Sequence, residues 1–264
     1  MNLPLFGKTI VVTRAAGQSN QFSHSLQNYG AKVIEMPTIE IVAPSSWAEL
    51  DHAISILNEF DWLVLTSTNA VDYFFERLGS QLQDVRGLAA IKIAVVGEKT
   101  AQRLRQRGLQ PDFIPPEFVA DAMVVNFPGS IEGKKILFPR VETGGRDVLV
   151  RAFSDRGAII TEVAAYQSTC PKIPDAKSIS VIQDHSVNLV TFASSKTVKH
   201  FCELLQKSIG EQWVESLEKV KFASIGPQTS KTCRALLGRV EIEAEEFTLD
   251  GLIKAIVAQS HTLQ

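Results

Sequence analysis

The chain repeats itself at about half its length, and this repetition limits the folds that are open to it. Five segments of the first copy return in the second. They are GKTIVVTR (7–14) as GKKILFPR (133–140), YGAKVIE (29–35) as RGAIITE (156–162), WLVLTSTNAVDYFFERL (62–78) as LVTFASSKTVKHFCELL (189–205), IAVVGEKTAQRL (93–104) as FASIGPQTSKTC (222–233), and EFVADAM (117–123) as EFTLDGL (246–252). The offset stays between 126 and 129 residues throughout, so we interpret the chain as internally duplicated.

Each copy alternates short apolar runs with polar loops and helical stretches. The runs are rich in Val, Ile, Leu and Phe, which is typical of parallel strands buried on both faces. We predict strands at 9–13, 62–66, 92–96, 135–138, 187–192 and 221–225. Apolar residues at helical spacing follow them, for example at Val71, Phe74, Phe75 and Leu78. This alternation predicts an α/β fold with doubly wound parallel sheets, and the duplication predicts two such domains.

The boundary between the two domains can be drawn in two ways. A simple cut falls near Gly129–Gly133, in a turn-like stretch between the copies. Alternatively, the first strand and helix of each copy complete the sheet built by the rest of the other copy. Two extended, proline-bounded segments at equivalent positions, PTIEIVAP (37–44) and VAAYQSTCP (163–171), are suited to cross between domains in that case. The residues alone leave both options open.

Charge and cysteine content exclude several classes of protein. The formal net charge is −2, which is too near neutral to attract nucleic acid or an anionic membrane in bulk. Three widely spaced cysteines without a CxxC pair favour a reduced, cytoplasmic compartment, and the five histidines show no metal-ligand spacing. No stretch is long and apolar enough to span a membrane, and no signal-peptide pattern opens the sequence. We expect a monomer, because no long exposed apolar stripe is apparent.

Polar clusters follow four of the predicted strands, where ligands bind in open parallel sheets. They contain Thr66 and Ser67, Gly97 and Thr100, Ser194 and Ser195, and Gly226 and Thr229. Each cluster also begins a helix, whose free N–H groups and dipole attract carboxylates or phosphates. Any one cluster could be an ordinary helix cap, and it is their repetition that favours a binding site. No GxGxxG or GxxxxGK[ST] motif is present, which argues against dinucleotide and P-loop sites.

Three further residues are candidates for the site. Arg14 and Arg140 end equivalent strands, where a guanidinium could clamp a carboxylate through two hydrogen bonds or simply face solvent. Tyr166 lies in the segment VAAYQST, and its counterpart in the other copy is Ile39. The phenol is therefore not a simple packing requirement of that strand, although a half-buried strand tyrosine remains the alternative.

Taken together, the segments GKTIVVTR, DWLVLTSTNAV, AAYQSTCP, TFASSKTV and FASIGPQTS, in this order and spacing, resemble the uroporphyrinogen-III synthase family. The resemblance covers nearly the whole chain. It implies two flavodoxin-like α/β domains joined by a two-stranded ribbon, and so favours the crossing arrangement. The first domain would comprise 1–36 and 172–264, the second 44–162, and the connecting strands 37–43 and 163–171.

The resemblance also implies an activity. The family closes hydroxymethylbilane, a linear tetrapyrrole polycarboxylate, into uroporphyrinogen III with inversion of the last ring and loss of water, and needs no metal or organic cofactor. Tyr166 matches a tyrosine near the family's cleft and is a candidate acid for loss of the hydroxyl. The strand-end residues named above fall on the family's cleft motifs, whereas Gln228 departs from the GPT often found there.

Two other functions are compatible with the residues. One is a non-catalytic two-lobed protein that binds or senses an acidic small molecule, with the same rim of helix N-termini. The other is a nucleotide-dependent transferase, which the missing phosphate-loop glycines argue against. Tyr166 and the full set of motifs favour the enzyme.

Overall fold

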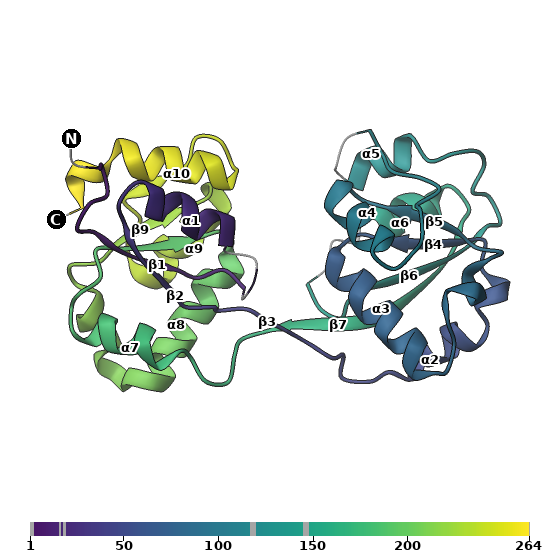
Figure 1. Ribbon diagram of the computed structural model, residues 1–264, viewed down its shortest axis with the longest axis horizontal. Helices are drawn as coiled ribbons and strands as arrows, with labels where there is room; N and C mark the ends of the chain where they lie inside the picture. The colour runs from purple at the N-terminus through teal and green to yellow at the C-terminus, as the bar shows by residue number, and fades with distance from the viewer. Residues whose placement is uncertain (1–2, 16, 18–19, 117–119, 145–147, 264) are drawn as a thin grey trace. The chain divides into compact units, whose positions relative to one another are not determined.

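A computed structural model of the chain describes residues 3–15, 17, 20–116, 120–144 and 148–263. The segment EFVADAM thus begins outside the described residues. Contacts divide the chain into two units, unit 1 (residues 1–40 and 169–264) and unit 2 (residues 41–168), whose helices and strands are labelled in Figure 1. The described parts of both units are α/β structures built on a sheet with parallel strand pairs.

Unit 1 contains a five-stranded sheet in the order β10-β9-β8-β1-β2. Its strands are β1 (Thr9–Val12), β2 (Lys32–Glu35), β8 (Leu189–Phe192), β9 (Lys221–Ser224) and β10 (Ile242–Glu243). Its helices are α1 (Asn20–Asn28), α7 (Ala176–Gln183), α8 (Ser195–Ile209), α9 (Pro227–Leu237) and α10 (Leu249–Ala258). All four neighbouring pairs in this sheet are parallel.

Unit 2 contains a five-stranded sheet in the order β3-β7-β6-β4-β5. Its strands are β3 (Glu40–Val42), β4 (Trp62–Leu65), β5 (Lys92–Val95), β6 (Lys135–Val141) and β7 (Ile159–Thr169). Its helices are α2 (Ala48–Ser55), α3 (Thr68–Ser80), α4 (Glu98–Arg105), α5 (Ala120–Val125) and α6 (Val148–Asp155). The first residue of β3 and the last of β7 belong to unit 1, so these two strands pass from one unit to the other.

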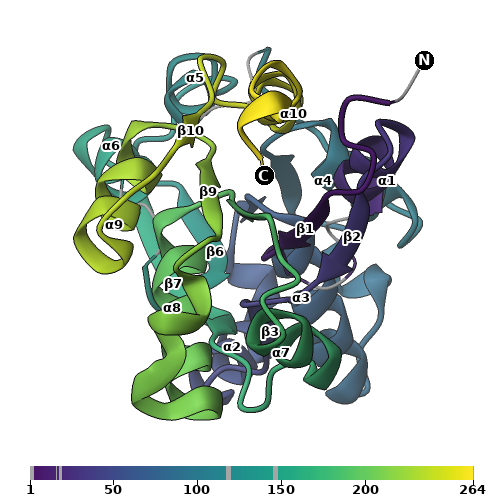
Figure 2. The same cartoon turned by 90° about the vertical axis from the view of Figure 1, so that its left-hand side faces the viewer.

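Helices cover both faces of each sheet because successive strand residues point to opposite sides. The helices of unit 1 lie around its strands in Figure 2. Ile10 and Val12 pack with apolar residues of α1 and α10, whereas Val11 packs with residues of α7, α8 and α9. In unit 2, Leu63 and its neighbours pack against α2, α3 and α4, while the opposite face packs against α5 and α6. Strands buried on both sides explain why the sequence shows continuous apolar runs there.

The chain does not divide near Gly129–Gly133. β1 pairs with β8, more than 170 residues later in the chain, and β6 pairs with β4, which precedes it. When β6, β7, β4 and β5 are matched with β1, β2, β8 and β9, the four strands occur in the same spatial order in both sheets. A parallel bridge from Ala94 to Phe113 beside β5 matches the pairing of Ala223 with Ile242 beside β9.

The predicted strands are present, with differences at their ends. β1, β4, β5 and β9 each stop one residue before the predicted end, because the next residue already leads into the following loop or helix cap. β8 begins at Leu189 rather than at residue 187, and β6 continues to Val141 rather than ending at residue 138. Of the predicted connecting strands, residues 40–42 are extended within β3. β7 begins at Ile159 rather than at residue 163, and it pairs with β6 inside the unit 2 sheet.

Candidate functional site

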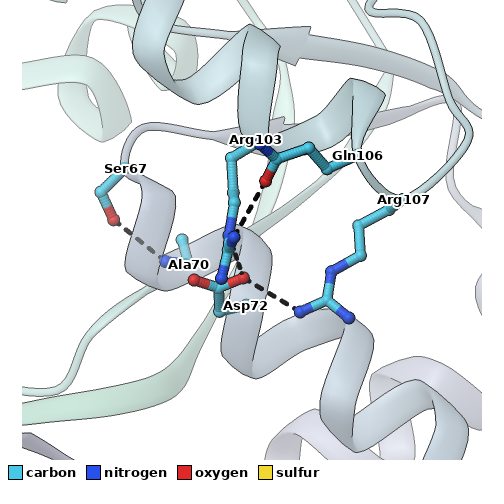
Figure 3. A network of polar contacts seen from close by, with 6 residues as sticks. All are labelled: Ser67, Ala70, Asp72, Arg103, Gln106 and Arg107. Carbon is cyan, nitrogen blue, oxygen red and sulfur yellow. Dashed lines mark hydrogen bonds and ion pairs between the residues drawn. The ribbon is translucent and has the colours of Figure 1, made fainter.

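In unit 2, the loops after β4 and β5 each lead into the N-terminus of a helix. Ser67 is the N-cap of α3, and its Oγ accepts a hydrogen bond from the Ala70 N–H at 3.0 Å (Figure 3). Gly97 is the N-cap of α4 with φ +85°, a left-handed conformation that favours glycine. Thr66 is half-buried between strand and cap, whereas Thr100 lies in the first turn of α4 and is only 4% exposed. The edge therefore offers backbone N–H groups more than open hydroxyls.

Tyr166 of β7 approaches this edge. Its hydroxyl lies 3.1 Å from the Oγ of Ser67, although the two residues are 99 positions apart in the chain, and either oxygen can donate. Because Ser67 Oγ already accepts the Ala70 N–H, the arrangement joins the phenol to the N-terminus of α3. The Tyr166 side chain is buried, with 8% of its surface exposed. The structure thus brings together two residues that the sequence identified separately.

Two further aromatic side chains of unit 2 form a stack with Tyr166. Its ring stacks with that of Tyr73 at a centroid distance of 5.9 Å, and Tyr73 stacks with Trp47 at 6.4 Å. The Tyr73 hydroxyl donates to the carbonyl of Ile41 at 3.0 Å, and the Arg77 guanidinium lies 4.9 Å from the Trp47 ring centroid. Neither Tyr73 nor Trp47 was predicted from the sequence. The available signal was their aromatic character, which is equally typical of a core position.

An ion-pair network joins the N-terminal half of α3 to the C-terminal end of α4 and the residues that follow it. The carboxylate of Asp72 on α3 accepts hydrogen bonds from Arg103 at 2.6 Å and from Arg107 at 3.0 Å (Figure 3). Arg103 also donates to Gln106, and the hydrogen bond to Asp72 raises the pKa of Arg103. These side chains are 26–43% exposed, so the network contributes little to stability and serves to align the two helices.

Arg140 of β6 lies in a polar depression of about 790 Å³ in unit 2. Its guanidinium forms an ion pair with Glu162 on the neighbouring strand β7. Glu142 also lines the depression and accepts hydrogen bonds from the side chain and backbone N–H of Ser45, which lower the pKa of its carboxyl. Among the described lining residues, glutamates outnumber cations. A substrate carboxylate would have to compete with Glu162 for Arg140, and the clamp role of Arg140 stays a prediction.

In unit 1, the loops after β8 and β9 begin helices in the same manner. Ser194 is the N-cap of α8, and its Oγ accepts the Thr197 N–H at 3.2 Å. Gly226 is the N-cap of α9, followed by Pro227 in the first turn, where a missing N–H costs no hydrogen bond. These caps are the counterparts of Ser67 and Gly97.

Two more predicted residues of unit 1 lie at these helix ends, and Arg14 follows β1. The Ser195 hydroxyl donates to the carbonyl of Gln228 at 3.0 Å and so links the starts of α8 and α9. Thr229 is 4% exposed, and its N–H bonds the Gly226 carbonyl at 3.0 Å. Arg14 is half-buried, and burial lowers the pKa of its guanidinium.

The described residues contain no group of three His, Cys, Asp or Glu side chains that could hold a metal ion. Within that same part of the chain, every helix is too short or too polar to cross a membrane.

Comparison with known proteins gives a consistent result. A family model described as "Uroporphyrinogen-III synthase HemD" matches residues 20–254. A uroporphyrinogen-III synthase of Synechococcus elongatus is 53% identical over 254 residues, covering 96% of each chain. A "porphyrin biosynthesis protein HemD" of Ruminiclostridium josui is 30% identical over 97% of this chain and 49% of its own length.

Solved structures resemble the chain in fold. A mutant uroporphyrinogen III synthase from the extremely thermophilic bacterium Thermus thermophilus matches with a TM-score of 0.58 at 17% identity, covering 97% of this chain and 100% of that one. The enzyme from Helicobacter pylori matches with a TM-score of 0.61 at 16% identity, covering 95% and 99%. At these identities the likeness concerns the α/β fold alone.

Proposed function

This chain belongs to the uroporphyrinogen-III synthase family, and from that premise we propose how its residues carry out the reaction. It is a cyclising lyase of tetrapyrrole biosynthesis. It converts hydroxymethylbilane, a linear tetrapyrrole with eight carboxylates, into uroporphyrinogen III, inverting ring D and releasing water.

We propose that Tyr166 is the acid that assists loss of the substrate hydroxyl. The observation that supports this role is the 3.1 Å contact between its phenol and Ser67 at the N-terminus of α3. As the C–O bond breaks, its electron pair stays on oxygen, which takes the phenol proton and leaves as water. The pyrrole nitrogen stabilises the resulting cation. The proton released when the pyrrole rings regain aromaticity restores the phenol, so the overall proton balance is zero.

The remaining task is to orient a flexible chain. Once the hydroxyl has left, the electron-rich pyrrole that carried it is itself the electrophile, so no further group is needed to activate it. The protein must then direct ring D to react through its substituted carbon, which gives a spiro intermediate. Catalysis by proximity and orientation can account for this without a triad or a carboxylate pair. One general acid adds about 10²-fold or more.

We propose that the helix N-termini bind the substrate carboxylates. A polyanion of this size needs many distributed donors, and each N-terminus contributes roughly 0.3–1 kcal/mol. The residues proposed for unit 2 are Thr66, Ser67, Gly97, Thr100 and Arg140, and those for unit 1 are Arg14, Ser194, Ser195, Gly226 and Thr229. We expect the backbone N–H groups to contribute more than the hydroxyls, because Thr100 and Thr229 are buried.

We also propose that the units are flavodoxin-like domains that arose by duplication. Their boundaries would be 1–36 with 172–264, and 44–162, joined by a ribbon of 37–43 and 163–171. A repeated hydrogen bond supports this proposal. Asn188 Oδ1 accepts the Thr9 N–H at 2.8 Å, and at the equivalent place Asp61 Oδ2 accepts the Lys135 N–H at 2.9 Å. We propose a cytoplasmic monomer acting on this small molecule.

The test uses freshly generated hydroxymethylbilane, which cyclises without enzyme to the type I isomer. The ratio of type III to type I uroporphyrin is measured after oxidation, with Tyr166→Phe compared against Tyr29→Phe, a tyrosine 39% exposed at the end of α1. We expect Tyr166→Phe to lower kcat by about 10²-fold while Tyr29→Phe keeps it. Wild-type turnover in Tyr166→Phe would remove the phenol from the mechanism. A ratio for the unaltered protein equal to that without protein would favour a non-catalytic binding protein.

A further inference from the structure

Phe247 is an exposed aromatic residue at the same sheet edge as the unit 1 helix caps. It lies in the loop between β10 and α10, and 64% of its surface is exposed. β10 runs parallel to β9, so the loops that leave these two strands emerge from one edge. The loop after β9 contains Gly226, the cap of α9. Phe247 therefore stands where ligands bind in parallel sheets.

The Phe247 ring packs directly against Gly226. A Cβ atom placed on Gly226 would lie 2.8 Å from Cδ1, 3.2 Å from Cγ and 3.4 Å from Cε1 of that ring. Gly226 has φ 163°, an extended conformation that any residue adopts. Close approach of the ring, and not backbone strain, is therefore what requires a glycine here.

The loop that carries Phe247 is held on its far side as well. Thr248 caps α10 through its Oγ1, which accepts the Gly251 N–H at 3.0 Å. A Cβ on Gly251 would lie 2.1 Å from the Glu246 carbonyl oxygen, so the backbone on both sides of Phe247 is closely packed. The backbone that carries the ring is thus held in place, while most of the ring's surface faces solvent. An aromatic side chain has only two side-chain torsions, so it loses little conformational freedom when a ligand stacks on it.

The chemistry around the ring indicates which part of the substrate it suits. Glu245 and Glu246 precede Phe247, which disfavours a carboxylate at this point. Lys254 bonds both oxygens of Glu246, at 3.0 and 3.2 Å, and offsets its charge. A pyrrole ring offers an uncharged, electron-rich face that can stack on phenylalanine.

We propose that Phe247 is a specificity-determining residue that stacks against one pyrrole ring of the linear tetrapyrrole. The proposal rests on the proposed function and assigns a place for a ring of the substrate, beyond the groups that hold its carboxylates. Gly226 takes part because its missing side chain lets the Phe247 ring approach the cap of α9 closely.

The test compares Phe247→Ala with Phe6→Ala. Phe6 is 66% exposed in the same unit but precedes β1, at the opposite end of the strands. We expect Phe247→Ala to raise KM about 3- to 10-fold, with a smaller change in kcat, and Phe247→Trp to restore KM. Phe6→Ala should match the unaltered protein. A KM for Phe247→Ala within twofold of that protein, or an equal rise in Phe6→Ala, would overturn the proposal.

A binding measurement separates this proposal from the catalytic one. In Phe247→Trp, uroporphyrinogen III should change the tryptophan fluorescence by more than it does in the unaltered protein, which already contains three tryptophans, whether or not the variant turns over. An equal change in the two proteins at saturating product would also refute stacking at this position. If Tyr166→Phe kept full turnover while Phe247→Ala raised KM, the acid assignment would fail and the stacking assignment would stand.

Discussion

Replacing Ser67 by alanine removes one hydroxyl that makes two contacts. Ser67 Oγ caps α3 by accepting the Ala70 N–H at 3.0 Å, and it bonds the Tyr166 hydroxyl at 3.1 Å. Losing an N-cap costs about 1 kcal/mol, and losing a neutral hydrogen bond costs about another 1 kcal/mol. We therefore expect Ser67→Ala to lower the free energy of unfolding by about 2 kcal/mol.

Ser194→Ala is the matched control in unit 1. Ser194 caps α8 by accepting the Thr197 N–H at 3.2 Å, and the counterpart of Tyr166 in the repeat is Ile39, which has no hydroxyl. The control should lose only the cap, about 1 kcal/mol. Urea denaturation followed by circular dichroism measures both variants. Equal losses would refute a contribution from the Tyr166 contact.

The same variants test whether the hydroxyls act chemically. If the backbone N–H groups bind the substrate, each variant loses at most about tenfold in kcat/KM, which corresponds to roughly 1.4 kcal/mol. Ser67→Ala should keep most of its kcat, because Tyr166 retains its proton. A fall of about 10²-fold or more in kcat with the fold intact would show that the Ser67 hydroxyl takes part in proton transfer.

Three further predictions concern the scaffold. Gly251→Ala should lower the melting temperature strongly, since its Cβ would lie 2.1 Å from the Glu246 carbonyl oxygen. Gly79→Ala within α3 is the control, because a Cβ there would meet open space. It should raise the free energy of unfolding by about 0.5–1 kcal/mol. Iodoacetamide should label Cys233 at pH 8 only on unfolding, because burial raises the pKa of its thiol to about 12. The free energy of unfolding should fall as the pH rises from about 9 towards 12, because the unfolded thiol loses its proton first. Labelling of Cys233 in the folded protein, or stability that is flat over this range, would contradict the last two.

Local patterns predicted the elements of this fold well. The apolar runs became parallel strands because a strand buried on both faces needs apolar residues at every position. The stripe of Val71, Phe74, Phe75 and Leu78 is buried on α3, as helical periodicity predicts. The ends of the strands were predicted less accurately, because the residue that follows a strand is often of a type that strands also contain.

Site residues were predictable one at a time, and their neighbours were not. Ser67 and Gly97 stand at helix starts because short polar residues and glycine are the best caps, which the sequence displays directly. The stacking of Tyr73 on Tyr166 has no such sequence signal, since an aromatic residue on a helix is compatible with any apolar partner. The same holds for Phe247, whose contact with Gly226 depends on two separate loops.

Sequence alone determined the α/β class, the family and the residues available to the site, because these depend on periodicity, capping and motif order along one segment. The pairing of β1 with β8 and the meeting of Tyr166 with Ser67 required the folded chain. Such contacts join residues about 100 to 180 positions apart, and their energy depends on the path that the backbone takes between them. Composition and local propensity do not contain that information.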